Sequence, residues 1–164
     1  MAKVPALIRL SNPLTRRLLR IGVPMGPNLL LTVRGRSTGQ PRTAPVAAVE
    51  VEGRRWIIGA YGEVQWVRNL RAAGEADIEA HGRTEHVTAV ALSRDEATEF
   101  FRDVLQPYVR SFPLLGRVFG RVLFGLIAPE VLNDPARAAA LRPVFELQPA
   151  LDAARVPYRG EPRD

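Results

Sequence analysis

Residues 29–42 read L-L-L-T-V-R-G-R-S-T-G-Q-P-R, an apolar run that becomes a polar turn rich in positive charge. The apolar part, residues 29–33, predicts a β-strand. Hydroxyls and backbone N–H groups in the turn can donate hydrogen bonds to phosphate oxygens, and guanidinium groups bind phosphate bidentately. The turn is therefore a candidate anion-binding site, and the alternative is an ordinary basic, solvated hairpin loop. The residues concerned are Arg34, Gly35, Arg36, Ser37, Thr38, Gly39 and Arg42.

The pattern G-R-x-[ST]-G-x-P-R after a short apolar strand resembles the signature of the deazaflavin-dependent nitroreductase and quinone reductase family. In this chain the pattern covers residues 35–42. A second family element follows at residues 57–62 (I-I-G-A-Y-G) and 65–70 (Q-W-V-R-N-L). Many relatives carry a lysine where Ser37 stands, and a short insert before the tryptophan that is only Glu63-Val64-Gln65 here.

This resemblance implies a mainly β, α+β fold: a split β-barrel of about six antiparallel strands with peripheral helices. It implies coenzyme F420 as the cofactor, with FMN as the alternative because its phosphate would occupy the same turn. Tyr61 and Tyr108 are hypothetical contacts of the hydride acceptor, and no catalytic side chain is expected because the cofactor carries the chemistry. The implied cofactor contacts are Arg36, Ser37, Thr38, Gly39, Gln40, Arg42, Gly59, Ala60, Tyr61, Gly62, Trp66 and Asn69.

The function implied by the resemblance is hydride transfer from reduced F420 to a small-molecule acceptor: a quinone, a nitroaromatic compound or an activated alkene. The sequence shows no catalytic triad, metal-ligand set or isolated carboxylate pair, which suits an enzyme that borrows its chemistry. The alternatives are an FMN-binding reductase, a non-catalytic carrier of a flavin or tetrapyrrole, and a basic protein that binds nucleic acid or anionic membrane. Nucleic acid is disfavoured because no aromatic residue precedes Trp56, so the basic stretch lacks a stacking platform. Because split barrels often pair, a homodimer is a further hypothesis.

Charge and composition indicate which ligands the protein attracts and where in the cell it is expected. The net charge is +6, and residues 1–49 hold eight basic side chains and no acidic one. Such a field attracts phosphates and anionic lipid. The chain has no cysteine, which excludes disulfides and thiolate metal sites. It has no recognisable signal peptide and no long uncharged apolar run, so we expect a cytoplasmic protein. Contact with the inner face of a membrane through the cationic, apolar segments 4–20 and 113–127 stays open.

The chain divides into three predicted parts. Residues 1–27 form a basic amphipathic helix and linker, residues 28–148 the cofactor-binding barrel with a helical insert at about 94–141, and residues 149–164 a flexible tail. Strands are predicted at 29–33, 43–51, 55–60, 76–81, 84–92 and 142–147, and a helix at 64–73. A capping box at Ser93 and Glu96 starts the insert, whose first helix Pro107 should end or bend. His81 and His86 have no metal-ligand spacing and are predicted to be surface strand residues.

Overall fold

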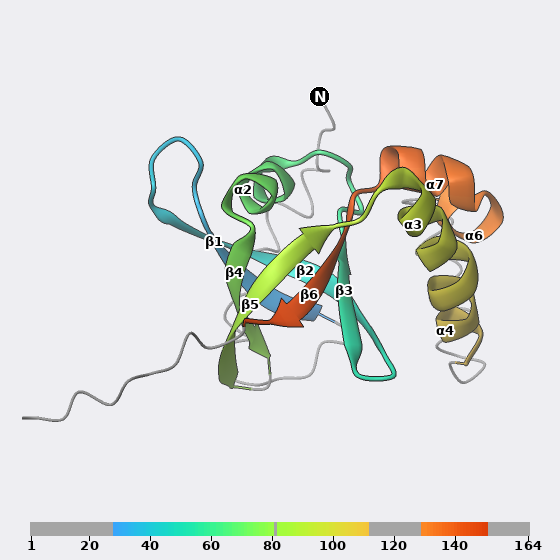
Figure 1. Ribbon diagram of the computed structural model, residues 1–164, viewed down its shortest axis with the longest axis horizontal. Coiled ribbons are helices and arrows are strands. Elements are labelled where there is room, and N and C mark those ends of the chain that lie inside the picture. The colour runs from blue at the N-terminus through green and yellow to red at the C-terminus, as the bar shows by residue number, and fades with distance from the viewer. Residues whose placement is uncertain (1–27, 81, 112–128, 151–164) are drawn as a thin grey trace, which may run out of the picture.

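Six antiparallel strands form a closed barrel in the order β1-β2-β3-β6-β5-β4 (Figure 1), in a computed structural model that describes residues 28–80, 82–111 and 129–150. The predicted six-stranded α+β barrel is confirmed. The strands are β1 (Asn28–Arg34), β2 (Pro41–Val51), β3 (Arg54–Ile58), β4 (Glu75–Ala80), β5 (Arg83–Ala91) and β6 (Val144–Pro149).

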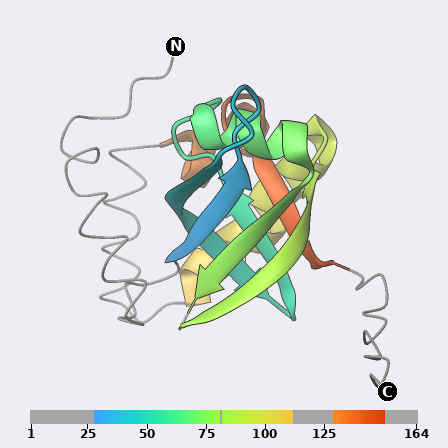
Figure 2. The same ribbon diagram turned by 90° about the vertical axis from the view of Figure 1, so that its left-hand side faces the viewer.

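Helices cover one end and one side of this barrel. Helix α2 (Gln65–Ala73) connects β3 to β4 and lies across one end (Figure 2). The insert between β5 and β6 forms a helical layer along one side (Figure 1). That layer consists of α3 (Arg94–Glu99), the π-helical η1 (Phe100–Leu105), α4 (Gln106–Ser111), α6 (Glu130–Asn133) and α7 (Pro135–Leu141).

The strand β3 shows why two separate cores exist. Its successive side chains alternate between the faces of the sheet, so Ile57 points into the barrel while Trp56 and Ile58 point toward the helical layer. The barrel interior is filled by aliphatic residues and Phe145, and α2 adds Val67 and Leu70 to it. Because each fully buried large apolar side chain contributes about 1.5–3 kcal/mol, both cores are needed for a stable barrel.

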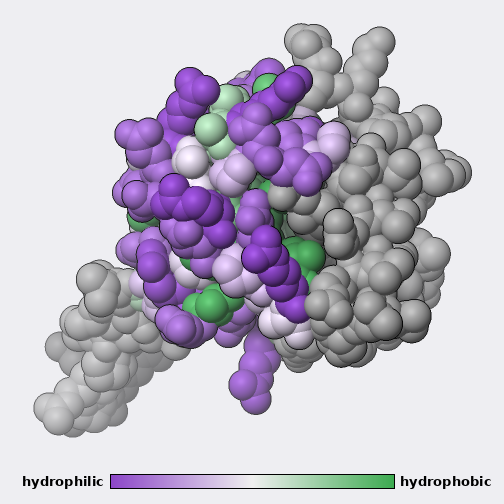
Figure 3. All heavy atoms as spheres, turned by 90° about the vertical axis from the view of Figure 1, so that its right-hand side faces the viewer, coloured by the Kyte–Doolittle hydropathy of each residue, from purple (hydrophilic) through white to green (hydrophobic). Residues whose placement is uncertain are grey.

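The helical layer packs its own apolar face on the outside of the barrel. Phe100 lies 5.5 Å from Trp56 between ring centroids, and Phe101 is fully buried beside it. Figure 3 shows this side of the molecule, where the described surface is mostly hydrophilic with small, separate hydrophobic patches. The described helices therefore bury their apolar faces against the barrel. No helix in the described ranges is long and apolar enough to cross a membrane.

Local signals in the sequence explain how the helical layer begins and ends. Ser93 Oγ accepts from the Glu96 backbone N–H, and the Glu96 carboxylate accepts from the Ser93 N–H at 2.7 Å, which confirms the capping box. Pro107 was predicted to end or bend this helix, and it does not end it. The backbone instead widens into η1, where the Gln106 N–H donates to the Phe101 carbonyl, and then continues as α4.

The remaining strand predictions agree with the structure to within a few residues. The last strand begins at Val144 rather than 142, after Pro143 and the extended residue Arg142. His86 is exposed on β5, as predicted, although the sheet places Asp77 directly opposite it. The hydrogen bond to Asp77, at 2.7 Å, raises the pKa of His86 above its ordinary value. Pro149, predicted as the first residue of the tail, instead ends β6. The predicted segments 4–20 and 113–127, His81, and the predicted tail from residue 151 on lie outside the described residues.

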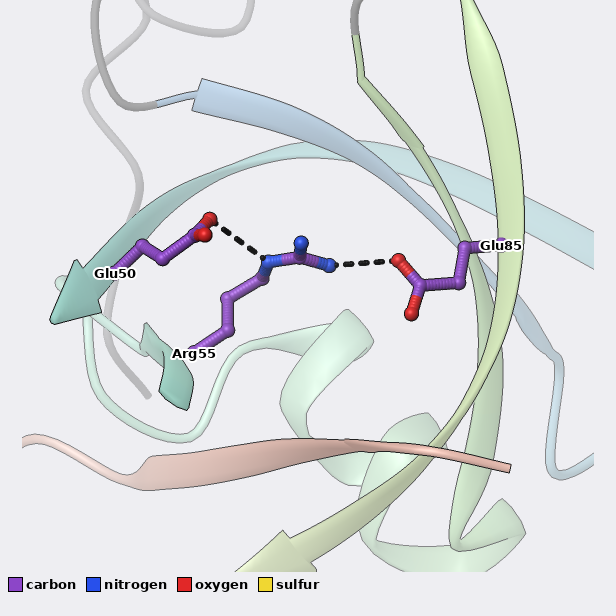
Figure 4. Close-up of polar contacts among 3 residues, drawn as sticks. All are labelled: Glu50, Arg55 and Glu85. Carbon is purple, nitrogen blue, oxygen red and sulfur yellow. Dashed lines mark hydrogen bonds and ion pairs between the residues drawn. The ribbon is translucent and has the colours of Figure 1, made fainter. Parts of the chain in front are cut away.

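A charged group closes the barrel end opposite α2. Arg55 donates to Glu85 at 2.9 Å and to Glu50 at 3.3 Å, bridging strands β2, β3 and β5 across the barrel mouth (Figure 4). All three side chains share the inward face of their strands, by alternation with the core residues Ile57 and Val87. Arg55 is 28% exposed, so water reaches the group but does not surround it.

Replacing Arg55 by methionine keeps the length of the side chain but leaves the carboxylates of Glu50 and Glu85 facing each other. We expect Arg55→Met to lower the free energy of unfolding by about 1 kcal/mol at low salt, since the group is partly solvated. The loss should shrink at high salt because salt screens the repulsion between carboxylates. Urea denaturation at both salt concentrations measures this, and equal stability of variant and parent at low salt would contradict it.

Candidate functional site

Three segments meet at the barrel end that α2 closes. They are the β1–β2 loop (residues 35–40), the β3–α2 loop (residues 59–64) and the first turns of α2 (Figures 1 and 2). Strand directions bring them together, because β1 and β3 both end there and β2 begins there. The two loops that carry the predicted cofactor contacts are therefore neighbours of one helix.

The β1–β2 loop is a compact turn held by its own backbone. The Gly35 N–H donates to the Gln40 carbonyl and the Gly39 N–H to the Gly35 carbonyl, both at 2.8 Å. A Cβ added at Gly35 would lie 3.1 Å from both the Gln40 carbonyl oxygen and Thr38 Oγ1, so a side chain there would require these neighbours to shift slightly. Ser37, Thr38, Gln40 and Arg42 remain exposed around this turn.

Arg36 ties this loop to α2. Its Nη1 donates to Gln65 Oε1 and to Asn69 Oδ1, both at 2.9 Å, and its backbone N–H reaches Asn69 Oδ1 at 3.4 Å. Gln65 and Asn69 are four residues apart and so share one face of α2. Asn69 is 6% exposed and is the only buried polar side chain in the described ranges. Its partnership with Arg36 explains how it is tolerated there.

The β3–α2 loop is a series of tight turns. The Ala60 N–H donates to the Ile58 carbonyl at 2.9 Å, the Gly62 N–H to the Gly59 carbonyl at 2.8 Å, and the Val64 N–H to the Gly62 carbonyl at 2.8 Å. Gly62 has φ of 72° and lies against the end of α7, where an added Cβ would be 3.2 Å from the Leu141 carbonyl oxygen. Glycine is favoured there for both reasons.

Two aromatic residues flank this loop. Burial raises the pKa of the Tyr61 hydroxyl, although the charge of Arg142 acts in the opposite sense. Like any tyrosine hydroxyl at neutral pH, that of Tyr61 can donate a hydrogen bond. Trp66 is half-buried on α2, and its ring centroid lies 6.3 Å from that of Phe145. The predicted buried side of α2 thus consists mainly of Val67 and Leu70, with Trp66 at its margin.

The structure does not bring every predicted site residue to this end. Tyr108 lies on α4, where burial and then the nearby charge of Glu50 raise its pKa. Because Glu50 belongs to the Arg55 end of β2, Tyr108 lies far from the two loops. A cavity of about 320 Å³ opens between α2, α3 and α7, and none of the predicted cofactor contacts lines it. Its walls include Glu63, Arg71, Ser93, Arg94, Leu141 and Arg142.

Two residues of this region were missed by the sequence analysis. Gln65 was part of a quoted motif but was given no role, and its contact with Arg36 follows from its place one turn before Asn69. Arg142 was taken as the start of the last strand, yet its guanidinium contacts the Ala60 carbonyl. The partners in these two contacts are 29 and 82 residues apart in the sequence, so no local sequence pattern indicates them. No group of three or more metal-ligating side chains occurs among the described residues.

The profile of one protein family, the F420H(2)-dependent quinone reductases, matches residues 14–112, more than half of the 164 residues. The chain belongs to this family. Coenzyme F420 in its reduced form is therefore the cofactor of this reductase, and F420-dependent oxidoreduction is its chemistry. The matched region includes both loops and α2.

Several solved structures are similar to the chain. An F420-H2 dependent reductase, FDR-A, is 19% identical, with 74% of this chain and 94% of that chain covered and a TM-score of 0.49. A protein described as a domain-swapped dimer is 20% identical, with 83% and 95% covered and a TM-score of 0.47. HutZ, a heme storage protein from Vibrio cholerae, is 17% identical, with 84% and 88% covered and a TM-score of 0.45. A search of curated proteins gave no significant match.

The residues at the α2 end are compatible with a phosphate-bearing cofactor. The β1–β2 loop presents arginines and hydroxyls, and no acidic residue occurs between residues 29 and 49. Helix α2 begins without a side-chain cap and without an acidic residue in its first turn. Exposed N–H groups and cations in this arrangement attract anions.

Asn69 offers a test of how the β1–β2 loop is held. We expect Asn69→Leu, which keeps the size but removes the acceptor, to lower the free energy of unfolding by about 1 kcal/mol. The Arg36 amide should then exchange its proton faster with solvent, measured by NMR hydrogen exchange. Asn69→Asp keeps an acceptor oxygen and is the matched control. If the Arg36 amide exchanges equally slowly in both variants, Asn69 does not anchor the loop.

Proposed function

We propose that this reductase holds reduced F420 at the α2 end of its barrel and passes a hydride to a quinone. The observation that carries the proposal is the β1–β2 loop: a basic turn with exposed hydroxyls, fixed to α2 through Arg36 and Asn69. A pre-fixed cationic turn binds a phosphate without a further ordering cost. The proposal takes the acceptor class from the family description.

The cofactor phosphate is assigned to the exposed side of that turn. Arg42, Ser37 and Thr38 would bind its oxygens, with Gln40 assisting and the Gly39 backbone close by. Arg36 would contribute through Nε and Nη2, because both hydrogens of its Nη1 are directed at Gln65 and Asn69. Arg36 would then have two tasks, one toward α2 and one toward the phosphate.

The rest of the cofactor is assigned to the β3–α2 loop. Residues 59–62 (Gly59, Ala60, Tyr61 and Gly62) would approach the ring and ribityl chain through backbone groups, with Trp66 beside them. Asn69 Oδ1 accepts from Arg36, so Asn69 would act on the cofactor mainly by positioning Arg36. The first turn of α2 lies between the two proposed contact regions.

When bound, reduced F420 supplies the hydride. The hydride brings two electrons and one proton equivalent to the quinone, and a second proton from solvent completes the hydroquinone. The protein's part is to bind, orient and exclude water. Tyr61, which lies in the loop assigned to the ring, is proposed to donate its hydroxyl hydrogen bond to the quinone oxygen on which negative charge develops.

The assignment of the phosphate predicts the effect of removing its arginines. We expect Arg42→Ala and Arg36→Ala each to weaken F420 binding about tenfold or more, because a charged hydrogen bond contributes roughly 1.5–3 kcal/mol. Fluorescence titration of the purified protein with F420 measures this. Parallel titrations with FMN and with a tetrapyrrole test the alternative ligands.

Arg34→Ala is the matched control for these variants. Arg34 belongs to the same hairpin, but alternation from the buried Val33 places it on the outer face of β1. We expect its loss to change F420 affinity by less than about threefold, through the general field alone. Equal losses in all three variants would indicate a diffuse electrostatic effect and no phosphate site in this loop.

Turnover separates the proposed reaction from simple ligand binding. With reduced F420 and a soluble quinone such as menadione, the absorbance of oxidised deazaflavin should return in proportion to the enzyme added. NADPH alone should not support turnover, because the sequence has no G-x-G-x-x-G dinucleotide motif. Parallel assays with a nitroaromatic compound and an activated alkene rank the acceptors. Binding of F420 without reduction of any acceptor would favour a carrier.

A further inference from the structure

Arg142 connects the helical layer to the β3–α2 loop. It follows α7, and its Nη1 donates to the Ala60 carbonyl. Its Nε and Nη2 lie 2.6 Å and 2.5 Å from Glu130 Oε1 on α6. One planar guanidinium thus holds a backbone carbonyl on one side and a carboxylate on the other. Lysine could not satisfy both partners in this geometry.

The pair is sheltered from water. The Arg142 side chain is 15% exposed and that of Glu130 is 9% exposed. Burial alone would raise the pKa of the Glu130 carboxyl, but hydrogen bonds from its own backbone N–H and from Arg142 keep the pKa below its ordinary value. The Glu130 carboxyl is therefore ionised at neutral pH, and removing Arg142 would leave that charge buried without its partner.

The loop has further contacts with the same segment. The Gly59 N–H donates to the Pro143 carbonyl at 2.8 Å, and Gly62 lies against the Leu141 carbonyl. Three successive residues, Leu141, Arg142 and Pro143, therefore border the loop from one side. The Pro143 ring also lies against Gly59, where an added Cβ would be 3.2 Å from Pro143 Cδ, while Arg142 donates a side-chain hydrogen bond to the loop. The conformation of residues 59–62 thus depends on the position of the chain after α7.

We propose that Arg142, fixed by Glu130, is a positioning residue that sets the backbone of residues 59–62 for the deazaflavin ring. This inference rests on the proposed function of that loop. Arg142 acts through the loop and is not assigned a contact with the cofactor. A loop that approaches its ligand by backbone alone cannot adapt through side-chain rotamers, so its backbone must be held in place beforehand. Misplacement of reacting groups by about 1 Å can cost a hundredfold in rate.

The test compares Arg142→Met with Arg55→Met. Each variant removes an arginine that is paired with a carboxylate, and both arginine side chains are partly buried, at 15% exposure for Arg142 and 28% for Arg55. Arg55, however, lies at the opposite end of the barrel. We expect both to lower the melting temperature. Only Arg142→Met should speed hydrogen–deuterium exchange of residues 59–64, and only it should weaken F420 binding, by about tenfold, with a fall in kcat/KM.

Conservative variants sharpen the comparison. Arg142→Lys keeps the positive charge but lacks the planar set of donors of the guanidinium. Compared with Arg142→Met, we expect it to restore the melting temperature more than the F420 affinity. Glu130→Gln keeps the shape but removes the charge that fixes Arg142, so we expect exchange of residues 59–64 to rise there as well. Equal exchange of residues 59–64 in Arg142→Met and Arg55→Met would overturn the inference.

The outcome is distinguishable from failure of the proposed function. If the parent protein does not bind F420, the proposed function fails, while the exchange of residues 59–64 still reports whether Arg142 holds the loop. If the parent binds F420 and Arg142→Met binds it within about twofold of the parent, the loop assignment to the ring is wrong even where Arg36→Ala and Arg42→Ala lose affinity.

Discussion

The alternation of side chains along β3 is the constraint on which the rest of the structure depends. Ile57 fills the barrel while Trp56 and Ile58 face the helices, so neither face of the strand is available to water over residues 56–58. A shift of one residue in its pairing with β2 or β6 would exchange the two sets and expose both cores. The register of β3 is therefore fixed from both sides, and with it the point where the chain leaves the sheet at Ile58.

Fixing that point positions the functional end of the molecule. The β3–α2 loop starts at Gly59, directly after the fixed strand, and the β1–β2 loop lies at the same end because β2 is antiparallel to both neighbours. The other end is closed by Arg55 with Glu50 and Glu85. One end of the barrel therefore carries a partly exposed charge cluster, and the other presents loops and a helix start.

Much of this arrangement could be predicted from the sequence, because it follows from short-range patterns. Apolar alternation located the strands, Ser93 and Glu96 marked a helix start, and the G-R-x-[ST]-G-x-P-R pattern singled out the β1–β2 loop. The response of the helix to Pro107 was harder to predict. Proline has no backbone N–H to donate, and a helix can accommodate this by ending, by bending or by a local change in its hydrogen bonding. Tertiary packing of Phe100, Phe101 and Val109 decides among them, and that packing is not visible locally.

The site was less accessible to sequence reasoning for a related reason. Arginines in a basic loop suggest ligand binding, yet the structure shows Arg36 directed at α2 and Arg142 directed at a backbone carbonyl. Each guanidinium carries several donors in a rigid plane, so one arginine can hold protein on one edge and present the other edge elsewhere. In the proposed site, Arg36 would therefore anchor the loop to α2 through Nη1 and bind the phosphate through its other donors. The two short loops gain a fixed shape in this way, together with the packing of Val64 on the barrel core. A fixed shape is what a borrowed cofactor requires of a protein that supplies orientation and not reactive groups.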